Sequence, residues 1–197
     1  MEEGQSVTFI DQIESWDQWL LLKINQSNNP FFDELMWGIS SPYFGIPFYL
    51  LFAYGFYRSF GLKEAVVICG LIALTVGISD LTAKYCFKDV FERYRPTHHL
   101  ILMEQLHLVN DYKGGTFGFI SSHASNMFSI GIWVILLLRK KIKWLVWLVL
   151  LWALLIGYSR VYLGVHYPSD VLVGSLVGSL IAGILYYLSK QFNWIKC

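Results

Sequence analysis

Five apolar runs, each close to the length of a membrane span, constrain this chain more than any other feature. A helix needs about 20 predominantly apolar residues to cross the hydrocarbon core of a bilayer. Charged residues make up only 15% of the 197 residues, well below the roughly 25% of a soluble domain. We therefore predict an all-α integral membrane helical bundle in a single domain, 1–197, with about five spans at residues 43–60, 65–85, 121–138, 144–161 and 170–188.

The segment before these runs has a different pattern. Between residues 9 and 24, apolar and aromatic side chains recur at three- and four-residue spacings, while Asp11, Glu14 and Asp17 take the other face. This predicts an amphipathic helix that lies in the membrane interface. A helix packed on a protein core would fit equally well. Met1 to Gln5 lack a basic region followed by an apolar stretch, so we expect no cleavable signal peptide.

Five spans would place the N-terminus, the long loop 87–117 and the turn between the last two spans on one side of the membrane. The other side would carry a group of basic residues opposed only by Glu64, namely Arg58, Lys63, Arg139, Lys140, Lys141, Lys143, Lys190 and Lys196. Basic loops usually stay in the cytoplasm. We therefore expect the basic side to be cytoplasmic and loop 87–117 to face the exterior.

A polar cluster separates the last two spans, with the spacing Ser159-Arg160-x5-His166-x-Pro168-x-Asp170. Charged groups at the edge of hydrocarbon are costly and suggest a functional reason. Pro168 suits the first position of a helix, which would place Asp170 in its first turn. The carboxylate could then bond one ring nitrogen of His166 and leave the other free to attack or to take a proton. Arg160 suits a phosphate. The alternative is a capped helix with a surface ion pair.

Two cations lie earlier on the same predicted side. Lys88 and Arg95 are seven residues apart and would share one face of a helix that Pro96 ends. A basic collar at a membrane boundary would have the same appearance. Within the second span, Asp80 and Lys84 are four residues apart and could pair and point inward.

The third cluster, Ser121-Ser122-His123, opens the third predicted span. Ser121 could cap that helix, and the uncapped N–H groups of Ser122 and His123 would form an anion site. A histidine at such a boundary can also simply contact lipid headgroups. The shared side of all three clusters favours a phosphoryl group as their common ligand.

The two histidines would then have separate tasks. His166, oriented and made more basic by Asp170, would attack phosphorus, and His123 would protonate the leaving oxygen. The cations would stabilise charge on the equatorial oxygens of the transition state. This scheme requires no metal and no other cofactor.

The three clusters resemble the three-part signature of the type 2 phosphatidic acid phosphatase family, which includes membrane lipid phosphatases and soluble vanadium haloperoxidases. The match runs from Lys88 to Asp170. The resemblance implies a phosphohistidine on His166, oriented by Asp170, with His123 as general acid. It also implies a phosphate held by Lys88, Arg95, Ser121, Arg160 and the amide of Ser122.

Two features depart from the family pattern. Its second motif usually reads Pro-Ser-Gly-His, where this chain has Ile120-Ser121-Ser122-His123. If position 122 needed a positive φ, serine would cost roughly 1 kcal/mol or more. We expect a helical conformation instead, where serine costs nothing. Many bacterial members also have six spans, whereas here the interfacial segment would replace the first.

We therefore expect metal-independent hydrolysis of a lipid phosphate or diphosphate at the outer face of the membrane. Undecaprenyl diphosphate, lipid A, phosphatidylglycerophosphate and phosphatidic acid are candidate substrates, and the outward site favours a diphosphate carrier lipid. Phosphotransfer to a non-water acceptor and lipid-phosphate binding without turnover are the alternatives.

Loop 87–117 contains His98, His99 and His107, which lack the spacing of zinc ligands and are expected to be solvent or lid residues. The expected partners are the lipid substrate and the bilayer. No nucleic acid is expected, and the sequence leaves the oligomeric state open.

Overall fold

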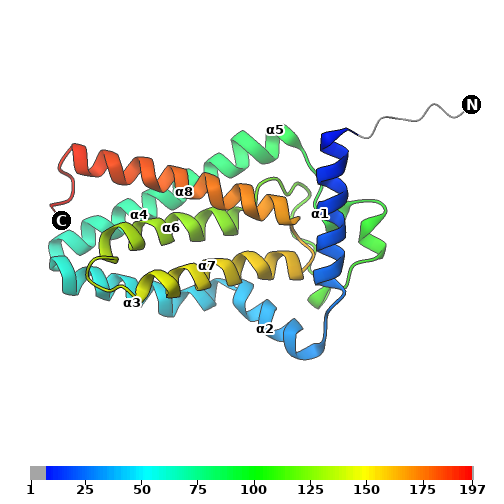
Figure 1. Ribbon diagram of the computed structural model, residues 1–197, viewed down its shortest axis with the longest axis horizontal. Coiled ribbons are helices and arrows are strands. Elements are labelled where there is room, and N and C mark those ends of the chain that lie inside the picture. Colours follow the sequence, from blue (N-terminus) through cyan, green and yellow to red (C-terminus); the bar gives the residue numbers. More distant parts are fainter. Residues whose placement is uncertain (1–7, 197) are drawn as a thin grey trace, which may run out of the picture.

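The computed structural model describes residues 8–196, and every regular element within them is a helix (Figure 1). This confirms the all-α prediction. Met1–Gln5, on which the expectation about a signal peptide rests, lie outside the described residues. The main helices are α1 (Phe9–Asn25), α2 (Pro30–Ser40), α3 (Pro42–Phe60), α4 (Leu62–Thr82), α5 (Asp89–Phe91), α6 (Ser122–Leu138), α7 (Leu145–Tyr162) and α8 (Pro168–Gln191).

Three of these helices are long and apolar enough to cross a membrane. One is Leu62–Phe91, in which a π-helical turn, Ala83–Lys88, joins α4 to α5, and the others are α7 and α8. The pair α2 and α3 satisfies the same test jointly, with a bend of 54° at the break. Helix α6 is apolar but has only 17 residues. The chain is therefore an integral membrane protein with three or four candidate spans, and the count of five stays a prediction.

Several helix boundaries follow from local sequence signals. Pro168 is the first residue of α8, as expected, and Ser121 is the N-cap of α6, where its Oγ accepts a bond from the Ala124 amide at 3.4 Å. Helix α2 was not predicted. Pro30 begins it, and Asn29 caps it by accepting a bond from the Phe32 amide at 3.1 Å.

Helices α6 and α8 pack against each other through glycines. A Cβ at Gly174 would lie only 2.7 Å from the carbonyl oxygen of Ser121. One turn further on, Ser129 Oγ on α6 donates to the carbonyl oxygen of Gly178 at 3.0 Å. Small residues permit this approach of two membrane helices. As a result, the Ser121 cluster at the start of α6 lies beside the start of α8.

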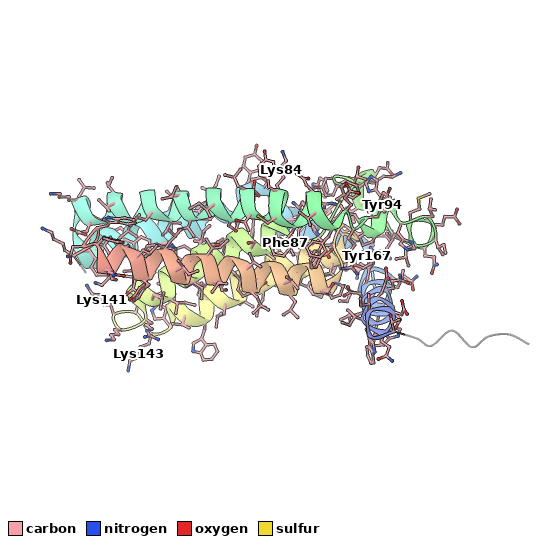
Figure 2. The ribbon with its side chains drawn as sticks, turned by 90° about the horizontal axis from the view of Figure 1, so that it is seen from above. Lys84, Phe87, Tyr94, Lys141, Lys143 and Tyr167 are labelled. Atoms are coloured by element: carbon pink, nitrogen blue, oxygen red, sulfur yellow. The ribbon has the colours of Figure 1, made fainter. Side chains whose placement is uncertain are left out.

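The polar clusters and the basic loop occupy opposite ends of the bundle. Figure 2 shows Tyr94 and Tyr167 at one end and Lys141 and Lys143 at the other. Helix α1 lies across the first end, roughly perpendicular to the long helices (Figure 1). The basic loop and the polar clusters thus lie at opposite ends of the bundle, and the orientation of the chain in the membrane stays a prediction.

Candidate active site

His166 lies between an arginine and a carboxylate. Its Nδ1 is 3.4 Å from Oδ2 of Asp170, and its Nε2 is 3.1 Å from Nη1 of Arg95. A guanidinium can only donate, so Nε2 must accept and Nδ1 must carry the proton that faces Asp170. The expected tautomer is therefore present. However, Nε2 is not free as we expected, because it accepts a hydrogen bond from Arg95.

The surroundings of His166 make it less basic, not more. Burial, and then the positive charges of Arg95, Arg160 and Lys88, hold the pKa of His166 well below its usual value. These effects outweigh any gain in basicity that His166 draws from Asp170, and that gain stays a prediction. The Asp170 carboxylate is already engaged, since it also accepts bonds from Arg93 and from the Tyr167 amide, each at 2.9 Å. The lowered pKa and the hydrogen bond from Arg95 to Nε2 both favour the neutral imidazole, the form in which a nucleophile can attack.

Arg93 is a site residue that the sequence did not reveal. Its Nη1 donates to Oδ1 of Asp170 at 2.9 Å, and its Nη2 donates to Oδ2 of Asp17 at 2.8 Å. The guanidinium also lies 4.0 Å from the centre of the Tyr167 ring. The sequence does contain a second arginine, Arg93, two residues before Arg95. The family motif includes only Arg95, so Arg93 was not predicted to belong to the site.

Asp17 anchors α1 to the active-site end of the bundle. It is 5% exposed and accepts bonds from Arg93 at 2.8 Å and from the Ser169 amide at 2.9 Å. Asp17 therefore packs against the protein, as in the alternative of a helix packed on a core, while the interfacial position of α1 stays a prediction. Several apolar side chains of α1 are exposed, with Ile10 at 73% and Trp16 at 68%, whereas Leu21 is fully buried. Such a helix fits an interfacial position and holds the site at the same time.

Arg95 reaches the site by a different route from the one we predicted. The helix ends at Phe91, and Glu92 adopts a left-handed conformation with φ of 45°. The chain then runs extended beside the end of the loop, where the Arg95 amide donates to the Thr116 carbonyl at 3.0 Å. Lys88 and Arg95 thus do not share a helical face. They nevertheless line one cavity of about 430 Å³.

The second motif contributes to this cavity through Ser122. Lys88 Nζ donates to Ser122 Oγ at 2.6 Å. Ser122 is the first residue of α6, so the serine sits in a helix as expected and carries no penalty for a positive φ. The amide of the preceding Ser121 donates to the carbonyl oxygen of Asp170 at 3.0 Å, which joins the second motif to the third.

Arg160 borders a further cavity together with His123. This cavity has a volume of about 620 Å³ and is also lined by Tyr112. Arg160 Nη1 donates to Oγ of Ser40, and its Nη2 donates to Oη of Tyr112 at 3.3 Å. Its Nε is buried and has no hydrogen-bond partner within residues 8–196. A buried guanidinium N–H beside His123 is suited to an anionic oxygen.

The loop histidines make structural contacts outside this group. His107 Nε2 lies 2.8 Å from Oδ2 of Asp33, His98 Nδ1 lies 3.1 Å from Oγ1 of Thr97, and His99 Nδ1 accepts a bond from the Ile101 amide at 3.3 Å. Across the described part of the chain, no group of three or more His, Cys, Asp or Glu side chains is arranged to hold a metal ion.

The predicted pair of Asp80 and Lys84 does not form. Both side chains are exposed, and Lys84 Nζ lies instead 4.8 Å from the centre of the Tyr85 ring. The π-helical turn that begins at Ala83 changes the helical register between the two residues, so the four-residue spacing no longer places them together.

Known proteins are similar to this chain in sequence and in fold. The lipid A 4′-phosphatase of Bacteroides thetaiotaomicron is 32% identical over 185 residues, covering 93% of this chain and 81% of that protein. The lipid A 4′-phosphatase of Porphyromonas gingivalis is 33% identical over 179 residues, covering 89% and 75%. The crystal structure of a transmembrane PAP2-type phosphatidylglycerolphosphate phosphatase from Bacillus subtilis superposes with a TM-score of 0.69 at 24% identity, covering 92% of this chain and 88% of that one.

The family comparison agrees with the three motifs. Residues 46–194 match the model of the PAP2 superfamily, a range that includes every residue from Lys88 to Asp170. The chain therefore belongs to the PAP2 superfamily, which confirms its resemblance to the type 2 phosphatidic acid phosphatases.

Proposed function

We propose that this protein hydrolyses a membrane lipid phosphate through a phosphohistidine intermediate on His166, without a metal ion. The single observation that carries the proposal is the arrangement of His166, whose Nδ1 faces Asp170 and whose Nε2 faces Arg95. A neutral imidazole with an oriented lone pair, surrounded by cations, is suited to attack a phosphate.

In the first step, Nε2 of His166 attacks phosphorus and the bond from phosphorus to the lipid oxygen breaks. His123 gives its proton to that oxygen, so the lipid leaves as an alcohol or, from a diphosphate, as a monophosphate. As the substrate binds, the hydrogen bond that Arg95 donates to Nε2 of His166 must break, and Arg95 must donate to a phosphate oxygen instead. Lys88 and Arg160 would hold the other oxygens.

In the second step, water attacks the phosphohistidine and His123 accepts its proton. The phosphorus–nitrogen bond breaks, inorganic phosphate leaves, and Nε2 regains its lone pair. Ser121 and the Ser122 amide would support the phosphate throughout, because both lie where α6 begins and its N–H groups point outward. Asp170 would keep the proton on Nδ1 in both steps.

The site would face the periplasm or exterior of a bacterial inner membrane. Support comes from the basic loop around Lys141 and Lys143, which lies at the end of the bundle opposite Tyr167 (Figure 2). Basic loops favour the cytoplasmic side. The exposed apolar side chains of α1 would then lie in the outer interface and bring the site to the level of lipid headgroups.

Among the candidate substrates, we place a lipid A-type phosphate first. The two curated relatives that cover most of this chain carry the name lipid A 4′-phosphatase. Undecaprenyl diphosphate, phosphatidylglycerophosphate and phosphatidic acid are the other candidates.

The test is phosphate release from these four lipids by the purified protein in detergent, with EDTA present. We expect release by wild type and by His99→Ala, a loop variant outside the site, and none above background by His166→Ala. Labelled substrate should leave phosphate on His166 after rapid alkaline quenching. Absence of release from wild type would favour a binding protein, and a phosphorylated product formed from an added alcohol would indicate transfer.

A further inference from the structure

A cavity of about 250 Å³ borders His123, the residue that would protonate the leaving oxygen. His123 and Ser122 form one part of its wall, and Asp80 and Asn126 supply further polar groups. Asp80 is the acidic side chain in this described lining, and His123 is its basic one. The cations Lys88 and Arg95 line the neighbouring cavity instead, which also contains Asp80 and Ser122. These two cations, which would hold the phosphate, thus line the neighbouring cavity and not this one, and Asp80 lies at the boundary between the two cavities.

Two acceptors in the lining of this second cavity, Asp80 and Asn126, have a particular significance. Asn126 Oδ1 is buried and has no hydrogen-bond partner within residues 8–196. A buried acceptor without a donor is costly, so a ligand that supplies an O–H or N–H gains by binding there. The Asp80 carboxylate also accepts only. Hydroxyl groups complement both residues, whereas a phosphate as leaving group would be repelled by Asp80.

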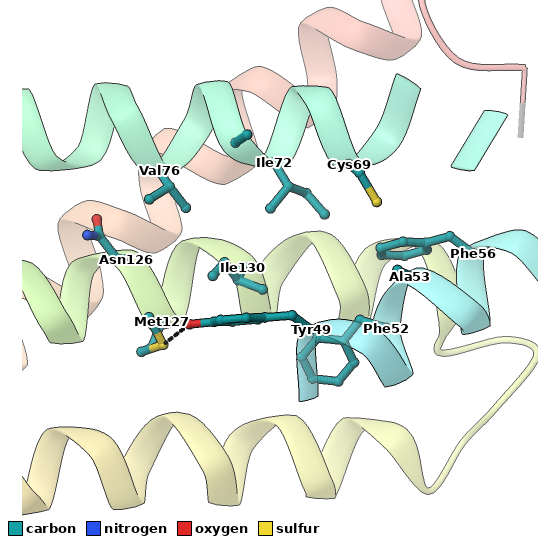
Figure 3. Close-up of a pocket in the computed structure, with 11 residues that line it drawn as sticks. Tyr49, Phe52, Ala53, Phe56, Cys69, Ile72, Val76, Asn126, Met127 and Ile130 are labelled. Atoms are coloured by element: carbon teal, nitrogen blue, oxygen red, sulfur yellow. Dashed lines mark hydrogen bonds between the residues drawn. The ribbon is translucent and has the colours of Figure 1, made fainter. Parts of the chain in front are cut away.

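The cavity continues toward the membrane. An apolar cavity of about 450 Å³ between α3, α4 and α6 shares Tyr49, Asn126 and Met127 with it. Figure 3 shows Tyr49 reaching from α3 to Met127 on α6, where its Oη donates to Sδ at 3.7 Å. The Tyr49 ring lies against Gly45, at which a Cβ would be 2.5 Å from Oη.

Starting from His123, the lining therefore changes from acceptors at Asp80 and Asn126 to hydrocarbon around Phe52, Phe56 and Ile72. This order matches a lipid in which the phosphate, a hydroxyl-bearing unit and the hydrocarbon chain follow one another. It does not match a lipid in which a second phosphate follows the first.

We propose that Asp80 and Asn126 form a leaving-group pocket that selects a neutral, hydroxyl-bearing unit, such as a sugar, over a phosphate. This inference rests on the proposed function. The enzyme then acts on phosphate monoesters of a glycolipid in preference to isoprenoid diphosphates. This assigns a specificity role to two residues outside the three motifs.

The experiment compares kcat/KM for three substrates at low ionic strength: a sugar-linked lipid monophosphate, an isoprenoid diphosphate, and an isoprenoid monophosphate without hydroxyl groups. Asp80→Asn removes the charge and keeps the shape. Asp89→Asn is the matched control, because Asp89 lies on the same long helix and lines only the cavity of Lys88 and Arg95.

We expect Asp80→Asn to lower kcat/KM for the sugar-linked lipid about tenfold, the effect of losing one hydrogen bond to a charged group. The same variant should raise kcat/KM for the diphosphate. Asp89→Asn should change all three substrates by a common factor. Asn126→Leu should slow the sugar-linked lipid and leave the isoprenoid monophosphate unchanged.

If Asp80→Asn changed kcat/KM by the same factor for all three substrates, the leaving-group pocket would be overturned. The same would follow if wild type preferred the diphosphate. Either result would leave the phosphatase proposal intact. A wild type without activity on any of the three would overturn both.

Discussion

Nη1 of Arg95 lies 3.1 Å from Nε2 of His166, so a proposed phosphate ligand is hydrogen-bonded to the proposed nucleophile. The contact keeps the lone pair of Nε2 directed at Arg95. When a phosphate binds, one of its oxygens can accept the hydrogen bond from Arg95 in place of Nε2. It also places a fixed positive charge next to the imidazole. Both consequences can be measured through the protonation of His166.

The first prediction concerns the pH dependence of kcat/KM. The pKa of His166 is held well below its usual 6.5, first by burial and then by Arg95. Wild type should therefore keep a neutral His166 as the pH falls below that value. Arg95→Gln removes one positive charge, so the pKa of His166 should rise and the acidic limb should move to higher pH.

Arg95→Lys is the control for this shift, because it keeps the charge and loses the fork of donors. Its rate should fall while its acidic limb stays near that of wild type. Both variants are compared on one substrate, so that the ionisation of the substrate cancels. An acidic limb at the same pH in Arg95→Gln as in wild type would contradict the electrostatic coupling to His166.

The sequence predicted those parts of the site that depend on local signals. Pro168 at the first position of α8 and Ser121 as the cap of α6 are written in adjacent residues, and both are observed. The route of Arg95 was missed because it depends on the left-handed Glu92 and on pairing with residues 116–118. Such contacts leave no periodic pattern in the sequence.

The contact of Arg93 with Asp17 was missed for a related reason. It joins residues 76 positions apart. From the sequence, Asp17 fitted the polar face of an interfacial helix as well as it fitted a buried anchor. Only the packing of α1 across the end of the bundle distinguishes the two (Figure 1).

The second prediction tests this anchor. Asp17→Asn should weaken the link from α1 to Arg93 and Ser169 and lower the stability by about 1–3 kcal/mol, the cost of a poorly satisfied buried group. Because Arg93 also holds Asp170, kcat should fall more than KM rises. Thermal unfolding in detergent and steady-state kinetics measure the two effects.

Glu14→Gln is the matched control on α1, since it removes the same charge one turn earlier from a half-buried position. It should leave both quantities near wild type. An equal loss in Glu14→Gln and Asp17→Asn would show that the overall charge of α1 matters, and not the contact with Arg93.

The third prediction concerns the packing of α6 on α8. A Cβ at Gly178 would overlap the carbonyl of Ser125, whereas a Cβ at Gly183 on the same helix would meet nothing within 4 Å. Gly178→Ala should therefore force the helices apart and cost about 1–3 kcal/mol, as overpacking usually does. Gly183→Ala should be neutral or slightly stabilising. A similar melting temperature for the two variants would contradict the close approach.

The fourth prediction concerns Ser122, where this chain departs from the glycine usual in the family motif. Ser122 begins α6, and its Oγ accepts a bond from Lys88 Nζ at 2.6 Å. The backbone N–H remains in Ser122→Gly, so the proposed amide contact to phosphate persists. Lys88 loses one hydrogen bond, and this should raise KM by roughly two- to tenfold with little change in kcat.

Lys88→Met provides the comparison, because it removes the charge itself as well as the bond. Its kcat/KM should fall much further than that of Ser122→Gly, since the cation is expected to stabilise the transition state and not only to bind the substrate. A large loss of kcat in Ser122→Gly would show that the hydroxyl takes part in the chemistry. If Ser122→Gly behaves as we expect, this serine holds Lys88 in position, and the motif tolerates it because the helix has already begun at position 122.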